Sequence, residues 1–380
     1  MQRDTGISTA PSLQHEAKVK ILILANHLEH SLGGIEIQCD LIAREVLAAG
    51  HSVVYGTPAF IEPLSKDYPY SIESCDLATP KSLVALIHKA KPDVIYLRNN
   101  KNRLRVMART AHQCGVPVVF AASSLQDVQP WAYHASQQPW TPRRIASVLW
   151  QRLKSRWNWS GFRYVSAAVS LNPDYTERLP VALRLHIPDS MDAAVEPFSW
   201  PRPYVAWVAQ LKDYKHPEEF VELARRCADT GLDFLMVGGL AHQRFSWIAR
   251  HQGTPDNFHY LGPMTLRQVN GFLAASRMLV HTCEPEGFGN NFIQAWLQRR
   301  ATLSLHFDPA GTIERHQLGY VPGNMDALEA SVRQLLADSQ LLDAMGQRAY
   351  QHAVTHYSPV TNVARLVEVF RRVVSQGAAL

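Results

Sequence analysis

Short apolar runs of strand length recur along this chain, and a stretch with helical periodicity follows most of them. One series of runs covers residues 19–25, 52–55, 93–98, 116–121 and 167–171, and a second covers residues 204–209, 234–239, 258–264, 278–282 and 301–305. Strands that alternate with helices are typical of parallel sheets with helical crossovers. The pattern predicts an α/β protein with two Rossmann-like domains.

Prolines separate the two series. Pro188, Pro197, Pro201 and Pro203 indicate a linker between domains. We expect a disordered lead-in at residues 1–17, a first domain at 18–198, a second domain at 199–358 and a C-terminal helix at 359–380.

Size and composition narrow the class of protein. The chain has 380 residues, 46% of them hydrophobic and 19% charged, which allows two cores in an ordinary globular protein. No apolar run reaches the ~20 residues needed to cross a bilayer, and the first residues lack the apolar centre of a secretory signal. The five cysteines are scattered without metal-ligand spacing, which predicts reduced thiols and no metal site. A formal charge of +5 favours anionic partners but is too weak to indicate nucleic acid.

The most informative segment covers residues 278–296, where a short strand is followed by a loop and a helix. The loop contains Gly287 and Gly289, and the helix is expected to open at Asn290 or Asn291 with apolar residues at helical spacing: Phe292, Ile293, Trp296 and Leu297. In open α/β sheets, ligands bind at the carboxyl ends of strands, beside the positive ends of helices. Glycines let the backbone approach a ligand closely, and the N–H groups of the first helical turn suit an anionic or hydroxyl-rich one.

Glu286 lies in this loop, and its chemistry has two interpretations. An ionised Glu offers only acceptors, so it could bind several hydroxyl groups of a ligand. It could also do no more than cap the following helix. The local residues leave both interpretations open.

The run from Glu286 through Gly287, Phe288 and Gly289, with Gln294 eight positions after Glu286, resembles the nucleotide-sugar motif of the retaining GT-B glycosyltransferases of family 4. That motif has a second Glu where this chain has Gln294. The resemblance extends over nearly the whole chain. It implies two Rossmann-like domains that face each other across a cleft, and a last helix that crosses back to the first domain.

The resemblance also implies the roles of the donor-side residues. Glu286 would bind the sugar hydroxyls and Gln294 the ribose, and we expect a Glu at position 294 to be tolerated. The family places an Arg-like residue and, five positions later, a Lys against the diphosphate. Gln210 and Lys215 hold these positions here, so Lys212 could supply the first charge, although a solvent-exposed lysine pair is the alternative. The remaining donor candidates are backbone or loop positions: Gly33, Gly34, Gly262, Gly287, Phe288, Gly289, Asn290 and Asn291.

The first domain departs from the family pattern at one position. Family members often carry a His that faces the donor sugar just beyond the equivalent of residues 116–121. This chain has Ser123, Ser124 and Asp127 there. With Arg98, these three are our acceptor-side candidates.

Tryptophans and basic residues are interleaved between positions 130 and 161. The set comprises Trp131, Trp140, Trp150, Trp157 and Trp159 with Arg143, Arg144, Arg152, Lys154 and Arg156. Such a mixture suits a membrane–water interface with anionic lipids. Core packing with a solvated basic face is the alternative.

These features predict a retaining, metal-independent glycosyltransferase in the cytoplasm, at the inner face of a bacterial membrane. It would move a sugar from a nucleotide-diphosphate sugar to a glycan or lipid-linked acceptor in surface or exopolysaccharide synthesis. No cofactor is expected, and Glu286 and Lys215 are the catalytic candidates. Two other classes stay open: a non-catalytic sugar-nucleotide-binding assembly subunit, and a GT-B sugar-nucleotide epimerase or phosphorylase. Gln210 and Gln294 favour the subunit, whereas Glu286 and Lys215 argue against it.

Overall fold

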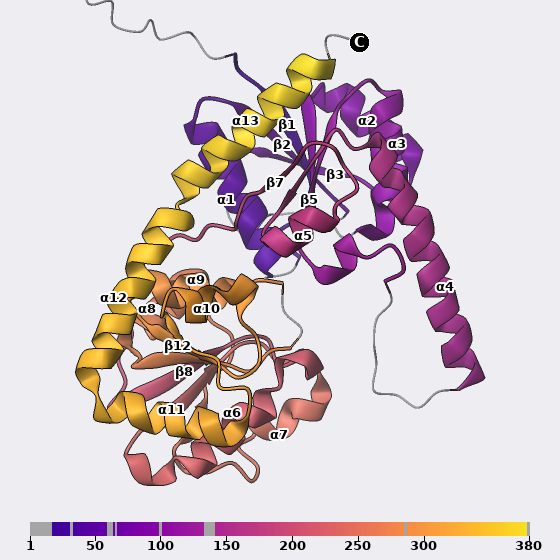
Figure 1. The fold of residues 1–380 in the computed structure, drawn as a ribbon. Helices are drawn as coiled ribbons and strands as arrows, with labels where there is room; N and C mark the ends of the chain where they lie inside the picture. Colours follow the sequence, from indigo (N-terminus) through magenta and orange to yellow (C-terminus); the bar gives the residue numbers. More distant parts are fainter. Residues whose placement is uncertain are drawn as a thin grey trace, which may run out of the picture.

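The computed structural model of the protein describes residues 17–30, 33–58, 64, 67–98, 101–132, 141–284 and 287–377. It contains two parallel sheets, each with helices on both faces, and Figure 1 shows the two domains one above the other. The first sheet has the strand order β3-β2-β1-β4-β5-β6-β7. Its strands are β1 (Lys20–Leu24), β2 (Ser52–Thr57), β3 (Ser71–Ser74), β4 (Val94–Leu97), β5 (Val118–Ala122), β6 (Ala167–Ser170) and β7 (Arg184–His186).

The second sheet has the strand order β10-β9-β8-β11-β12-β13. Its strands are β8 (Tyr204–Val208), β9 (Asp233–Val237), β10 (Phe258–Tyr260), β11 (Met278–His281), β12 (Ala301–Ser304) and β13 (Gly319–Tyr320). The helices of the first half are α1 (Gly34–Ala48), α2 (Pro80–Ala90), α3 (Leu104–Gln113), α4 (Pro142–Trp159) and α5 (Pro173–Arg178). Those of the second half are α6 (Pro217–Arg226), α7 (Ser246–Ala249), α8 (Leu266–Ala275), α9 (Asn290–Leu297), α10 (Thr312–Arg315), α11 (Met325–Ala337), α12 (Ser339–His356) and α13 (Pro359–Gly377).

The strand sequences are continuous apolar runs because helices cover both faces of each sheet. In β1, Leu22 and Leu24 belong to the core under α2 and α3, while Ile21 and Ile23 belong to the core under α1 and α13. Successive side chains of a strand point to opposite faces, so alternate residues enter different cores. This accounts for the lack of polar alternation in the sequence and confirms the predicted α/β architecture.

The last helix, α13, follows the second domain in sequence but packs on the first. Its apolar residues lie in the same core as β1 and α1, and the Phe370 ring lies 5.6 Å from the ring of Tyr96 in β4. The yellow helix in Figure 1 accordingly runs from the second domain up along the first. The first domain is therefore built from two separate parts of the chain.

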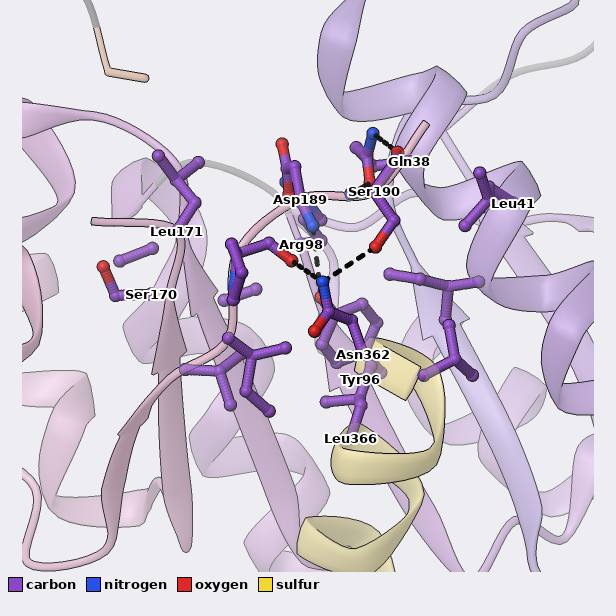
Figure 2. A pocket seen from close by; sticks show the side chains of 17 residues that line it. Gln38, Leu41, Tyr96, Arg98, Ser170, Leu171, Asp189, Ser190, Asn362 and Leu366 are labelled. Atoms are coloured by element: carbon purple, nitrogen blue, oxygen red, sulfur yellow. Dashed lines mark hydrogen bonds and ion pairs between the residues drawn. The ribbon is translucent and has the colours of Figure 1, made fainter. Parts of the chain in front are cut away.

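The linker after β7 is held by polar side chains from both of these parts. On α13, the amide of Asn362 donates to the Ser190 hydroxyl over 3.0 Å and to the Pro188 carbonyl over 3.4 Å. On α1, Gln38 accepts a bond from the Ser190 N–H over 3.0 Å and donates one to the Ser190 carbonyl over 2.5 Å. Figure 2 shows Asn362 and Gln38 pointing at Ser190 from different sides. The linker is thus fixed where it leaves the first domain.

Residues 326–355 contain two helices, because the Asp338 side chain accepts from the N–H of Leu341 and caps a new helix, α12. One detail differs from the sequence-based expectation. The short strands β3 and β13 were not expected. β13 has only two residues, and the half-exposed β3 carries no apolar run.

Candidate functional site

The strand order reverses between β1 and β4 in the first sheet and between β8 and β11 in the second. At such a point the connections leave to opposite faces and open a crevice at the carboxyl ends of the strands, where ligands bind in α/β proteins. The loops that follow β1, β8 and β11 carry most of the donor-side residues predicted from the sequence. The topology therefore brings these residues to matching positions in the two domains.

The first helical turns of α1 and α9 meet at this place. A Cβ atom added to Gly34, at the start of α1, would lie 2.8 Å from the Asn290 side-chain nitrogen at the start of α9. A larger residue at position 34 would require the Asn290 side chain to move. Because the N–H groups of a first turn lack intrahelical partners, the paired ends favour a negatively charged ligand.

The loop before α9 is tied to both domains. A Cβ atom on Gly287 would lie 2.8 Å from the Ser123 carbonyl of the first domain, and Asn172 donates to the Gly287 carbonyl over 3.3 Å. Gly289 has a φ of +88°, which favours glycine. The amide of Asn291 donates to the Val208 carbonyl over 3.0 Å and so joins α9 to the end of β8. Glu286 itself lies outside the described residues.

Phe288 contributes to the packing of this loop. Its side chain is buried, and its ring lies 5.4 Å from the ring of Tyr357 at the end of α12. An aromatic anchor of this kind holds the loop in place.

Lys212 and Lys215 follow β8 at the edge of the same crevice. The Lys215 carbonyl accepts a bond of 2.7 Å from the Thr282 hydroxyl, which in turn accepts one of 2.9 Å from the indole N–H of Trp207. Side chains of β8 and of the loop after β11 thus fix the backbone of Lys215. Partial burial and the charge of Lys215 lower the pKa of Lys212, and Glu36 opposes that shift. Two cations held this close favour an anion between them.

Other donor-side candidates lie around these groups. Gln210 is exposed at the start of the loop. Gly262 has a φ of +75°, and its carbonyl accepts a bond of 2.9 Å from the N–H of Gly238. A Cβ atom on Gly238 would lie 1.6 Å from the Ala209 carbonyl oxygen, so the loops after β8, β9 and β10 pack closely. Gly33 precedes α1 as its N-cap residue in extended conformation.

Gln294 has a structural partner that the sequence did not suggest. Its side chain is buried on α9, and its amide nitrogen lies 3.0 Å from the amide oxygen of Asn270 on α8. The nitrogen of Asn270 donates to the carbonyls of Asp192 and Ala194, so its oxygen must face Gln294. Gln294 therefore has to donate here, and a Glu at this position would lose the bond. A Glu at position 294 should therefore destabilise this contact, contrary to the expectation that Glu is tolerated.

Ser123, Ser124 and Asp127 form a local cap at the end of β5. The Asp127 carboxylate accepts bonds from the N–H groups of Ser123 and Ser124 and from the Ser124 hydroxyl, over 3.1, 3.0 and 3.0 Å. It also accepts a bond of 2.9 Å from the N–H of Lys101. Burial raises the pKa of Asp127, while these bonds act in the opposite direction. The carboxylate is engaged in holding the loop, and the serines are half-buried beside the second domain.

Arg98 lies behind the site rather than at its surface. It is buried and pairs with Asp189 over 2.6 Å, beside a cavity of about 20 Å³ that α13 closes. Figure 2 shows the pair next to Asn362. The volume suffices for about one water molecule. In this conformation Arg98 supports the linker and is closed off from an acceptor.

Comparisons with known proteins agree with this geometry. Residues 193–352 match the family model for glycosyl transferases group 1. Among curated proteins, none matches the chain.

Solved structures share the fold of the whole chain. HepE from Anabaena in complex with UDP-glucose has a TM-score of 0.74 and 16% identity, over 93% of this chain and 100% of that one. Sucrose-phosphate synthase from Thermosynechococcus elongatus has a TM-score of 0.74 and 14% identity, over 94% and 100% of the two chains. WaaG, a glycosyltransferase involved in lipopolysaccharide biosynthesis, has a TM-score of 0.66 and 15% identity, over 90% and 98%. These likenesses confirm the predicted GT-B fold.

One residue at the site was missed by the sequence reasoning. Glu36 lies in the first turn of α1, is buried, and is close enough to Lys212 of the second domain to influence the pKa of Lys212. A carboxylate two positions after the glycine pair, at the positive end of a helix, was a signal that could have been used. Among the described residues, no group of three or more His, Cys, Asp or Glu is placed to hold a metal ion.

The tryptophan-rich segment divides into a buried part and an exposed part. Trp159 packs against Phe162 at 4.8 Å and borders the core, whereas Ile145, Leu149, Leu153 and Trp157 are about half exposed at four-residue spacing along α4. Trp131 and Trp150 are exposed beside them, and Trp140 lies outside the described residues. Such a row forms one apolar face of a helix. Across the described ranges, no helix is long and apolar enough to span a bilayer.

Proposed function

We propose that this protein is a retaining glycosyltransferase of family 4 that moves a sugar from a nucleotide-diphosphate sugar to an acceptor. One observation carries the proposal: the first turns of α1 and α9 meet beside Lys212 and Lys215, within a GT-B fold whose second half matches the group 1 family model. Two helix N-termini and two cations at one place stabilise a diphosphate.

The chemistry that this arrangement supports is electrostatic. Lys215, Lys212 and the N–H groups near Gly289 and Asn291 would stabilise the negative charge that develops on the departing diphosphate. Glu286 would bind the sugar hydroxyls and position the reacting carbon. Because the leaving diphosphate itself can accept the proton of the acceptor, no protein nucleophile and no metal ion is required.

The structure limits which atom of the Gln294 amide group can contact a ribose. Its amide nitrogen is engaged with Asn270, so only the carbonyl oxygen would accept a bond from a ribose hydroxyl.

The acceptor would be a glycan or a lipid-linked glycan of a bacterial surface polysaccharide. Support comes from the apolar row on α4, which continues into basic residues on the same helix. A helix of this kind lies in the headgroup region of an anionic membrane, where a lipid-linked acceptor is presented. Peripheral binding to the inner membrane face forms part of the proposal.

The proposal is tested by a thermal-shift screen of the full chain against UDP-, GDP- and ADP-sugars, followed by a transfer assay with the donor that binds. We expect one donor class to raise the melting temperature, because a ligand that binds only the folded state stabilises it. NMR of the product should show the anomeric configuration of the donor. Inversion would refute the retaining assignment, and no shift with any donor would refute the donor site.

A non-catalytic sugar-nucleotide-binding subunit is the second candidate. The engagement of Gln294 with Asn270 favours it, since a second carboxylate is absent from the motif. Donor binding without either transfer or slow hydrolysis of the sugar nucleotide would support this candidate instead.

A further inference from the structure

A second cavity lies at the junction of the two domains, where α12 gives way to α13. Its volume is about 230 Å³. The titratable or charged groups that face it are His186 at the end of β7, Arg315 in α10, His352 and His356 on α12, and Tyr357 and Arg365 beyond it. Figure 1 shows α5, α10 and the yellow crossover helix around this junction. The lining comes from both domains and from the segment that connects them.

The cavity is lined by basic side chains. None of the described residues that line the cavity carries a carboxylate, whereas two carry guanidinium groups and three carry imidazoles. The histidine rings lie close together: the ring centroid of His352 is 4.5 Å from that of His356 and 4.5 Å from that of His316. This surface holds positive potential without a compensating acid.

Burial is the main cause of the lowered pKa values of two of these imidazoles, and neighbouring positive charges add to it. Burial, followed by the charges of His356 and His316, lowers the pKa of His352 to about 4. Burial also lowers the pKa of His186, and the charges of Arg365 and His356 add to that effect. An anion placed among these groups would reverse the repulsion and favour the protonated imidazoles.

The size of the cavity limits the ligand. Sites for larger organic ligands usually measure about 300–1,000 Å³, so a whole nucleotide sugar does not fit here. A phosphate group does fit, and Thr312 and Thr361 supply hydroxyl groups beside the arginines. Guanidinium groups match the geometry of phosphate oxygens and bind them in pairs.

We propose that this cavity binds a small phosphate-bearing anion, either free phosphate or a phosphomonoester, separately from the donor cleft. Arg315 and Arg365 bind its oxygens, and the imidazoles of His186 and His352 take up a proton when it enters. Because Arg315 belongs to the second domain and His186 to the first, the bound anion joins the two domains. The site does not depend on the proposed transferase activity.

Calorimetry of the full chain tests the site with inorganic phosphate and with a sugar 1-phosphate as separate probes. With the donor cleft saturated by UDP, we expect one anion per chain, and the tighter probe identifies the source. Arg315→Gln and Arg365→Gln should each weaken binding about tenfold or more, since each removes a charged hydrogen-bonding group. Arg250→Gln, an exposed arginine at the end of α7, is the matched control and should bind as the wild type does.

Saturation of the donor cleft with UDP distinguishes the two sites. Phosphate binding should persist in its presence. Loss of phosphate binding on adding UDP, an unchanged affinity in both arginine variants, or an equal loss in Arg250→Gln would overturn the proposal.

The histidine contribution is measured with sulfate, whose charge stays constant over the pH range. Since the bound state holds more protons, affinity should rise as the pH falls from 7 to 5, by at most about tenfold per unit for each proton taken up. His352→Gln should bind with nearly wild-type affinity at pH 8 and show a smaller pH slope. A slope equal to that of the wild type would contradict the role of His352.

Discussion

The apolar row on α4 leads to a quantitative prediction about membrane binding. Leu149 and Leu153 lie one turn apart, and their exposed fractions are 56% and 59%. Complete burial of a Leu side chain is worth about 1.5–3 kcal/mol. Because each side chain has about half of its surface left to bury, replacing both by Gln should remove about 2 kcal/mol of membrane affinity. This corresponds to roughly a thirtyfold weaker partition onto vesicles.

Co-sedimentation with vesicles that contain anionic lipid measures this effect. Gln and Leu have similar helix propensities, so the variant should melt at the wild-type temperature. Val360→Gln is the control, because Val360 is 70% exposed but lies at the start of α13. Raised salt should weaken binding of the wild type, since basic residues of α4 contribute. If the double variant sediments like the wild type, or if Val360→Gln loses as much, α4 does not bind the membrane.

Three further predictions concern the donor site. Lys215→Ala should weaken nucleotide-diphosphate binding by about ten- to a hundredfold and leave nucleoside binding unchanged. Calorimetry with both ligands measures the two affinities. An equal loss of affinity for both ligands would mean that Lys215 has a structural role. Glu286→Gln should lower turnover while nucleotide affinity stays near the wild-type value, because sugar contacts that strengthen in the transition state affect turnover. A combined loss of folding and nucleotide binding would instead mark Glu286 as a helix cap. Gln294→Glu should destabilise the fold by about 1–3 kcal/mol through its contact with Asn270, and denaturant unfolding measures it; unchanged stability would contradict that reasoning.

In helix α9 the buried face could be predicted from the sequence, whereas the partner of one polar side chain could not. Apolar spacing predicted its buried face, and Phe292, Ile293 and Trp296 are all buried. The start at Asn290 also agrees with the structure. The partner of Gln294 was not predictable, because Asn270 lies on another helix and is oriented by carbonyls of the linker. Local periodicity identifies a face, whereas the partner of a polar side chain depends on distant packing.

The tryptophans of α4 show that composition alone does not predict which side chains are buried. Trp157 and Trp159 are two positions apart and so lie on different sides of a helix. Trp157 is exposed, while Trp159 borders the core beneath Lys101, whose ammonium lies 5.5 Å from its ring. A count of tryptophans and arginines supported both the interfacial and the core interpretation. The structure shows one part of the segment packed against the core and another part exposed, and the interfacial role of the exposed part stays a prediction.

The return of α13 to the first domain has a consequence for biosynthesis. The apolar residues of α13 complete a core whose other buried members precede Pro188 in sequence: Val363, Leu366, Val367, Val369, Phe370 and Val373. About 190 residues must therefore be synthesised between β7 and the end of α13. At about 5–20 residues per second this takes roughly 10–40 s, during which one face of the first sheet is covered by α1 but not by α13. Nascent chains of this protein should depend on chaperones during that interval, although the finished protein buries the face completely.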